Sequence, residues 1–152
     1  MLDTEQPPLR IVVFCADSLT TEYLQTILDH HRFAIFPADL TVAGIVDALK
    51  FSPDMFIVDD TDSTICLLDT CQTIRQYSVS PILVLSLSRT PGLAEKILDA
   101  GADDFLSKPV SGNLLIARLN TLARRTLAER DAARAIARGD KPGQQVLGLL
   151  NY

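Results

Sequence analysis

The chain has 152 residues, 47% of them apolar, with a mean hydropathy of +0.20 and a formal net charge of −5. This length suits one domain with a substantial hydrophobic core and leaves little room for a second. No apolar run is long enough to span a membrane, and residues 1–10 carry acids and prolines where a secretory signal needs an apolar stretch, so we expect a cytoplasmic protein.

Charge is unevenly distributed along the chain. Residues 1–110 contain seven basic and sixteen acidic side chains, whereas residues 111–152 contain seven and three. The acidic body argues against a nucleic-acid surface there. The basic tail is interpreted as a solvated helix face, with contact to an anionic partner as the alternative. Cys15, Cys66 and Cys71 lack disulfide or metal-ligand spacing and are expected to be small buried side chains.

Short apolar runs alternate along the chain with longer segments of helical period, an order typical of a parallel sheet with crossover helices. Residues 10–15 predict the first buried strand, and residues 18–30 predict the first helix, with Ser18 or Thr20 as its N-cap. The expected buried face of this helix consists of Leu19, Tyr23, Leu24, Ile27 and Leu28.

The second unit begins with a strand over residues 33–36, which we expect to end at Pro37. The helix that follows should stop before Pro53. Its expected buried face consists of Val42, Ile45, Val46 and Leu49. A third strand is predicted over residues 55–58.

The third helix is predicted over residues 64–76, and its expected buried residues are Leu67, Leu68, Cys71 and Ile74. The very apolar run 82–87 predicts a fourth strand in the interior of the sheet. Thr90 and Pro91 indicate the start of a fourth helix with proline at its first position, and Gly101 indicates its end.

Residues 104–107 predict the fifth strand, after which Ser111 is expected to cap a last helix with no breaker until Gly139. That helix is about twice as long as a five-stranded domain needs to cover its sheet. We therefore divide the chain into a globular domain over residues 9–125 and a C-terminal helical extension and tail over residues 126–152.

Polar side chains stand at the ends of three predicted strands. Asp59 follows the third strand, Ser86 ends the apolar core of the fourth, and Lys108 follows the fifth. Because the carboxyl ends of parallel strands meet at one edge, where such sheets bind ligands, one site can contain all three. A carboxylate nucleophile beside a hydroxyl and an ammonium is suited to accept a phosphoryl group.

Three segments make this pattern more specific, namely residues 53–59 (PDMFIVD), 81–86 (PILVLS) and 101–109 (GADDFLSKP). Together they resemble the receiver domain of bacterial response regulators, the CheY-like superfamily, over residues 9–125. The resemblance implies a flavodoxin-like α/β fold with a doubly wound, five-stranded parallel sheet of order 2-1-3-4-5. The extended C-terminal helix is added to that fold.

The resemblance also implies roles for individual residues. Asp59 would be the phospho-acceptor, Ser86 the switch hydroxyl, Lys108 the ammonium that binds the phosphoryl group, and Phe105 the switch aromatic. The Lys108–Pro109 peptide would be cis, as it often is in the family.

The implied cofactor is Mg²⁺, held by Asp59, by the backbone carbonyl of Thr61 and by two acids after the first strand. Here Cys15 and Ala16 stand in place of those acids, and a thiol is a poor ligand for a hard cation. Asp17, one position later, reaches the metal only if the loop shifts. We therefore expect an atypical receiver with weakened Mg²⁺-dependent phosphorylation.

The leading hypothesis is a bacterial receiver in two-component phosphorelay signal transduction, a phosphoprotein rather than an enzyme, phosphorylated by a histidine kinase or a phosphotransfer protein. Its last strands and helices would bind an output protein or domain, with homodimerisation through that face or through the extended last helix. The alternative is a phosphorylation-independent pseudo-receiver that serves as a docking or dimerisation module. Neither hypothesis involves a membrane or direct nucleic-acid binding.

A minor alternative is an enzyme. Residues 60–65 (DTDSTI) resemble the DxDxT signature of haloacid-dehalogenase-like phosphatases, but the only acids after Lys108 lie on or after the last helix rather than at a further strand end.

Asp60 is also unusual for a receiver, because an apolar residue normally follows the phospho-acceptor.

Overall fold

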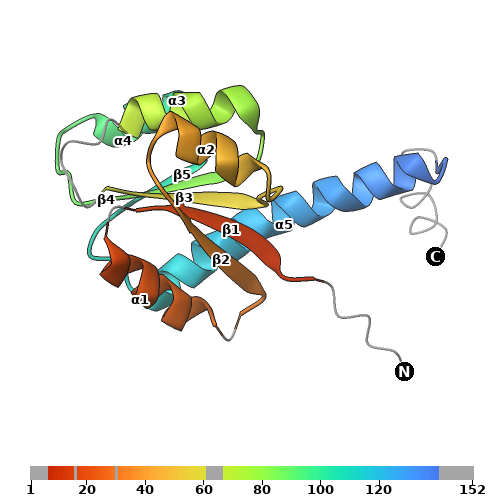
Figure 1. Ribbon diagram of the computed structural model, residues 1–152, viewed down its shortest axis with the longest axis horizontal. Coiled ribbons are helices and arrows are strands. Elements are labelled where there is room, and N and C mark those ends of the chain that lie inside the picture. The colour runs from red at the N-terminus through yellow and green to blue at the C-terminus, as the bar shows by residue number, and fades with distance from the viewer. Residues whose placement is uncertain (1–6, 16, 30, 61–66, 141–152) are drawn as a thin grey trace, which may run out of the picture.

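The computed structural model describes residues 7–15, 17–29, 31–60 and 67–140. Five parallel strands form one sheet in the order β2-β1-β3-β4-β5, and a helix follows each strand (Figure 1). The elements are β1 Leu9–Phe14, α1 Ser18–Leu28, β2 Phe33–Ala38, α2 Val42–Leu49, β3 Met55–Asp60, α3 Leu67–Tyr77, β4 Ile82–Ser86, α4 Leu93–Asp99, β5 Asp104–Ser107 and α5 Gly112–Ala137. This is the doubly wound, flavodoxin-like fold with the expected strand order and the expected long last helix.

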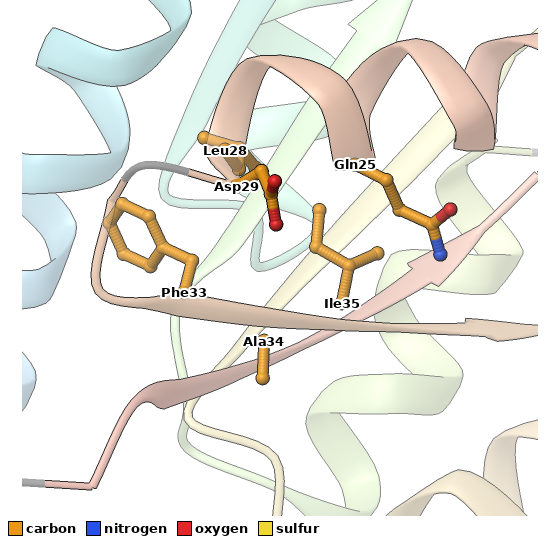
Figure 2. Close-up of a pocket in the computed structure, with 6 residues that line it drawn as sticks. All are labelled: Gln25, Leu28, Asp29, Phe33, Ala34 and Ile35. Atoms are coloured by element: carbon orange, nitrogen blue, oxygen red, sulfur yellow. The ribbon is translucent and has the colours of Figure 1, made fainter.

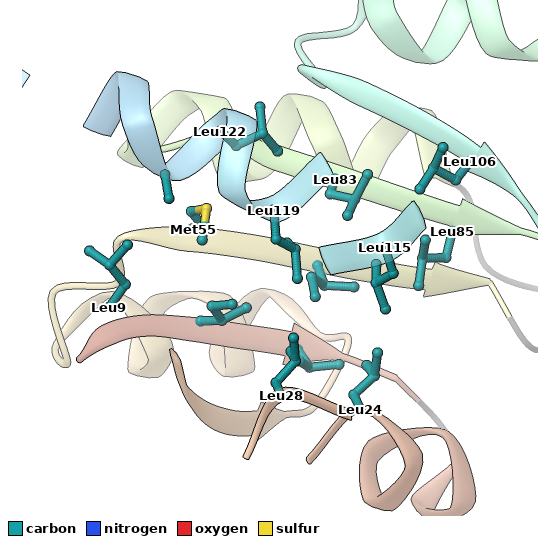
Figure 3. Packing of buried hydrophobic residues seen from close by; sticks show 14 residues of the cluster. Leu9, Leu24, Leu28, Met55, Leu83, Leu85, Leu106, Leu115, Leu119 and Leu122 are labelled. Atoms are coloured by element: carbon teal, nitrogen blue, oxygen red, sulfur yellow. The ribbon is translucent and has the colours of Figure 1, made fainter. Parts of the chain in front are cut away.

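Each face of the sheet has its own buried cluster. Helices α1 and α5 cover one face, and α2, α3 and α4 cover the other (Figure 1). Figure 3 shows the first cluster, in which leucines of α1 and α5 pack against side chains of the strands. Because side chains alternate along a strand, one strand contributes to both clusters, as Ile57 and Val58 of β3 do. The interior strands are therefore apolar on both faces, as is typical of parallel sheets.

The strand ends differ from their predictions by a few residues. Pro37 lies within β2 rather than ending it, because β2 is an edge strand and the missing N–H of a proline is tolerated there. β3 extends to Asp60, and β4 ends at Ser86, before Leu87, which is 57% exposed. β4 lies between β3 and β5, which confirms its predicted place in the interior of the sheet.

The predicted N-cap of α1 is wrong. Asp17, rather than Ser18 or Thr20, has the extended backbone of an N-cap, and its carboxylate accepts the backbone N–H of Leu19 at 2.9 Å. A carboxylate satisfies a first-turn amide and also interacts favourably with the positive end of the helix dipole. The Asp17 side chain is therefore occupied at the start of α1.

The buried faces of α1 and α2 are narrower than predicted. α1 packs through Leu24 and Leu28 with Ile27 partly buried, and α2 packs through Ile45 and Ala48 with Leu49 partly buried. Each helix touches the sheet along a stripe that is narrower than its apolar face, so apolar side chains at the edge of the stripe stay in solvent. The residues predicted to be buried but found exposed are Leu19, Tyr23, Val42 and Val46.

The start of α4 also differs from its prediction. The helix begins at Leu93, because Gly92 has a φ of 80°, a left-handed conformation that a right-handed helix does not contain. Pro91 therefore precedes the helix instead of occupying its first position. The predicted stop at Gly101 is confirmed by its φ of 118°, which is typical of the residue that follows a helix.

Helix α5 is anchored to the body well beyond the sheet. Ser111 caps it as predicted, since its hydroxyl accepts the backbone N–H of Leu114 at 3.2 Å. Burial continues to Thr126, and Arg130, one turn further on, forms an ion pair with the buried Asp54 just before β3. The C-terminal part of α5 projects from the body (Figure 1).

Candidate functional site

Asp59 and Lys108 form an ion pair at the carboxyl edge of the sheet. Asp59 lies near the end of β3, Lys108 directly follows β5, and the lysine Nζ contacts Asp59 Oδ1. Because β4 separates these two strands, the long lysine side chain reaches across it. The Asp59 side chain is 0% exposed and that of Lys108 is 15% exposed, so their attraction is screened less than at the surface.

The Ser86 hydroxyl faces a different carboxylate. It donates a hydrogen bond to Asp60 Oδ2 at 2.9 Å, and its oxygen accepts the backbone N–H of Ser88 at 3.0 Å. Asp59 and Asp60 are consecutive strand residues, so their side chains lie on opposite faces of the sheet. The register places Asp60 beside Ser86 and Asp59 beside Leu85. The structure thus brings Asp59 to Lys108 and leaves Ser86 bonded to Asp60.

The Asp60–Ser86 hydrogen bond was not predicted from the sequence. The signal that would have found it is the two-residue period of a strand, because two successive acids must face opposite sides and the second then meets the neighbouring strand. Phe105, the implied switch aromatic, pairs in register with Val84 and is half-buried against the cluster under α2, α3 and α4. It therefore lies on the Ser86 side of the sheet.

Cys15 contacts the buried carboxylate of Asp59. Its Sγ lies 3.7 Å from Asp59 Oδ2 and 3.3 Å from the carbonyl oxygen of Asp17. A thiol is a weak donor, so this contact offsets little of the charge on a buried carboxylate. Cys15 is half-buried rather than fully buried, whereas Cys71 is buried as expected, and Cys66 lies outside the described residues.

The described residues do not make a Mg²⁺ site, although receiver domains generally use Mg²⁺ for phosphorylation. Asp17 caps α1, and Asp60 accepts from Ser86 on the other face of the sheet. Within the part of the chain that the structure describes, no three His, Cys, Asp or Glu side chains are grouped as metal ligands. A hard cation needs several oxygen ligands, and Asp59 alone does not supply them.

Several predicted features lie outside the described residues. They include Ala16, the backbone carbonyl of Thr61 and the tail over residues 141–152. Of the phosphatase-like segment over residues 60–65, only Asp60 is described, and its carboxylate is bonded to Ser86.

A pocket of about 240 Å³ opens beside the ion pair. Asp59 and Lys108 are the charged groups of its lining, and Lys108 is joined to Pro109 by the cis peptide that the resemblance implies. The other lining residues are Thr20, Tyr23, Leu24, Leu85, Val110 and Leu115. A second hollow of about 320 Å³ lies between α1 and the edge strand β2, away from the site (Figure 2).

The fold and the buried carboxylate–lysine pair define a receiver-type α/β domain, and comparison with known proteins agrees. Residues 11–120 match the family model for the response regulator receiver domain. The chain therefore belongs to the response regulator receiver domain family, whose members act in signal transduction.

Curated relatives are response regulators about twice as long as the matched segment. The KDP operon transcriptional regulatory protein KdpE of Escherichia coli (strain K12) is 35% identical over 107 residues, covering 68% of this chain and 46% of that protein. Response regulator MprA of Mycobacterium leprae (strain TN) is 31% identical over 130 residues, covering 85% of this chain and 57% of that protein. The chain thus spans about half the length of the curated relatives that it matches.

Solved structures share the fold. The Francisella response regulator 1452 receiver domain superposes with a TM-score of 0.69 at 22% identity, covering 78% of this chain and 98% of that one. A two-component response regulator from Clostridium difficile gives a TM-score of 0.68 at 22% identity, covering 77% and 97%. At this identity the likeness establishes the fold alone.

Two general properties of the family bear on this chain. Response regulators are regulatory proteins rather than classical enzymes, and their receiver domains pair with histidine kinases and output domains.

In residues 7–140, as far as they are described, no helix has both the length and the apolar character that crossing a membrane requires.

Proposed function

We propose that Asp59 accepts a phosphoryl group and that Lys108 binds the oxygens of that group. The ion pair between these two side chains carries the proposal. An ammonium lies beside a carboxylate at the carboxyl edge of the sheet, the edge at which parallel sheets bind ligands, and such a carboxylate can act as a nucleophile. The ammonium offsets the negative charge that an incoming phosphoryl group brings. The pocket beside the pair supplies a route for a phosphoryl donor.

In the proposed step, a carboxylate oxygen of Asp59 attacks the phosphorus of the donor. The bond between phosphorus and the leaving group breaks, and the leaving group departs with the electron pair. With acetyl phosphate the leaving group is acetate, and with a phosphorylated kinase or phosphotransfer protein it is a histidine imidazole. The product is an acyl phosphate on Asp59.

We also propose that Mg²⁺ supports this step only weakly, through Asp59 and the backbone carbonyl of Thr61. Cys15 contacts Asp59 where the family has an acid, and the carboxylate of Asp17 is held at the N-terminus of α1. Phosphorylation should therefore be slow and respond little to the cation.

A phosphorylation-independent docking module is the second candidate. The observation that favours it is that the polar side chains of the site already have partners. Asp59 is fully buried and paired with Lys108, and Ser86 is hydrogen-bonded to Asp60. A module of this kind keeps the receiver fold and its binding face without a phosphoryl switch.

The partners of this chain belong to the same proposal. A histidine kinase or phosphotransfer protein would act at Asp59, and an output protein or domain would bind the face made by the last strands and helices.

Homodimerisation through that face or through the projecting end of α5 would appear as a concentration-dependent mass in light scattering. A monomer that persists at high protein concentration would exclude the dimer.

The two candidates separate in one experiment. The protein is incubated with acetyl phosphate, with and without Mg²⁺, and its intact mass is measured beside that of Asp59→Asn. A phosphate-sized gain in mass that is absent from Asp59→Asn supports the phospho-acceptor. No gain with or without the cation, together with no spectral response to beryllofluoride, supports the docking module instead.

A further inference from the structure

We propose that Asp60 is a positioning residue that holds the Ser86 hydroxyl away from Asp59 and thereby opposes phosphoryl uptake there. This inference rests on the proposed role of Asp59 as the phospho-acceptor. It concerns a residue that the ion pair between Asp59 and Lys108 does not involve, because Asp60 lies on the opposite face of β3.

The geometry commits the only proton of the Ser86 hydroxyl to Asp60. Its proton is donated to Asp60 Oδ2 at 2.9 Å, and its oxygen accepts the Ser88 N–H at 3.0 Å. A serine hydroxyl has one proton, so the same group does not donate to a phosphoryl oxygen at Asp59 while it is bonded to Asp60.

Burial makes this arrangement hard to exchange. Ser86 is 0% exposed and Asp60 is 9% exposed, so water does not readily replace either partner of the hydrogen bond. The bond is also charge-assisted, which makes it stronger than a bond between neutral groups. A phosphoryl group on Asp59 must therefore compete with a buried carboxylate for one proton.

The same hydrogen bonds connect the site to the segment before α4. Because the Ser86 oxygen accepts from Ser88, rotating the hydroxyl toward Asp59 also disturbs the first residues after β4. The Ser88 hydroxyl in turn lies 3.0 Å from that of Thr90, close to the start of α4. Asp60 thus stabilises one arrangement of this segment as well as one orientation of Ser86.

The first test is a double-mutant cycle of Asp60→Ala and Ser86→Ala, with the initial rate of phosphate uptake from acetyl phosphate measured by intact mass. With Ser86 present, Asp60→Ala should raise the rate about tenfold, the factor that corresponds to one charge-assisted hydrogen bond. In the Ser86→Ala background the increase should shrink to the part caused by removing a negative charge. An equal increase in both backgrounds, or a phosphorylated wild type with no increase in either background, overturns the positioning role.

The second test does not depend on phosphorylation. The proton coupling constants of the Ser86 side chain report its χ1 rotamer, which should be single in the wild type and averaged in Asp60→Ala. Asp60→Leu removes every hydrogen-bond acceptor and keeps a similar size, so it replaces Asp60→Ala if that variant does not fold. Asp47→Asn, which changes an exposed carboxylate on α2, is the matched control.

The two tests separate failure of this inference from failure of the proposed function. A single, unchanged Ser86 rotamer in the Asp60 variants overturns the positioning role, whatever the phosphorylation results are. An averaged rotamer with no gain in mass in any variant supports positioning by Asp60 and rejects Asp59 as a phospho-acceptor.

Discussion

At the scale of single residues, the environment of Asp59 is set by which neighbours carry a charge. Lys108 contributes one positive charge, and Cys15 contributes a half-buried thiol. Asp60 is adjacent in the chain but lies on the other face of the sheet. Successive side chains at the end of β3 therefore point to opposite faces of the sheet, and of the two acids only Asp59 lines the pocket.

Replacing Cys15 by aspartate should change how phosphorylation responds to Mg²⁺. A carboxylate there would stand beside Asp59, so uptake of phosphate should be slower than in the wild type without the cation, because two like charges meet. With Mg²⁺ it should be roughly tenfold faster, because the cation gains an oxygen ligand. Initial rates measured by intact mass check both signs.

Cys15→Asn is the control for that substitution, since asparagine has nearly the shape of aspartate and carries no charge. It should show neither the slower rate without Mg²⁺ nor the faster rate with it. Identical cation responses in Cys15→Asp and Cys15→Asn would contradict the idea that the missing acid weakens the metal site.

The buried thiol of Cys71 should make stability depend on pH in the alkaline range. Burial raises its pKa from 9.0 to about 11, and the nearby Arg75 guanidinium opposes that shift. Between these values the unfolded chain loses the thiol proton while the folded chain keeps it, so the free energy of unfolding falls as pH rises through this window, by at most about 3 kcal/mol. Below about pH 9 this contribution is fully present.

Denaturant unfolding from about pH 8 to about pH 11 measures this dependence. Cys71→Ala is the control, because it removes the titrating group while keeping a small apolar side chain. Its unfolding free energy should fall less steeply over the same range. Equal slopes for the two proteins would show that Cys71 does not titrate as described.

At the scale of elements, Asp103 ties three of them together at the amino end of β5. Its carboxylate accepts from Arg75 of α3 at 2.8 Å, from the backbone N–H of Ile82 in β4 at 2.8 Å, and from Arg125 of α5 at 2.7 Å. Arg75 also donates to the carbonyl oxygen of Gly101, at the end of α4. This end of the sheet is thus held by charge-assisted hydrogen bonds, opposite the edge at which Asp59 and Lys108 lie.

Asp103→Asn should lower the free energy of unfolding by about 2 kcal/mol or more, since it weakens several charge-assisted bonds to partly buried donors. Urea denaturation checks the value. Asp47→Asn is the control, because Asp47 forms an exposed ion pair with Lys50 at 3.1 Å, and its loss should change stability by less than about 0.5 kcal/mol. Similar effects of the two substitutions would contradict the role given to Asp103.

The element bounds show where sequence patterns succeed. The fifth strand, the caps at Ser111 and Gly101 and the order of elements were predicted, because each depends on local properties. Three features were missed, namely the Asp17 cap, the continuation of β2 through Pro37 and the late start of α4. Of these, only the continuation of β2 depends on its place at the edge of the sheet, whereas the Asp17 cap and the left-handed Gly92 are local features that apolar period does not resolve.

At the scale of the whole molecule, the two faces of the sheet carry different parts of the site. The ion pair and its pocket lie on the side of α1 and α5, whereas the Asp60–Ser86 bond and Phe105 lie on the side of α2, α3 and α4. A phosphoryl group on Asp59 would therefore have to act around the carboxyl edge of the sheet to affect Ser86 and Phe105 on the side of α2, α3 and α4. Ser86, whose strand lies between β3 and β5, is placed to make that connection.

We propose that the division of the chain at residue 125 be moved along α5, because the helix stays attached to the body beyond it. Arg130→Ala removes the ion pair to the buried Asp54, which also accepts the backbone N–H of Arg10 at 2.7 Å. The free energy of unfolding should fall by about 1 to 3 kcal/mol. Arg134 lies one turn further along α5 and is exposed, so Arg134→Ala should leave the free energy of unfolding nearly unchanged. Equal losses of stability in the two variants would place the domain boundary before Arg130.

The sequence by itself determined the fold class, the strand order through its resemblance to receiver domains, and the identities of Asp59, Ser86 and Lys108 as residues at strand ends. It did so because apolar period and strand-end polarity are local properties of the chain. Only the tertiary structure decided which of these residues meet. Contacts across a sheet depend on the register of the strands and on the face to which each side chain points. Register and face together explain why Asp59 forms an ion pair with Lys108 and why Ser86 donates its hydrogen bond to Asp60.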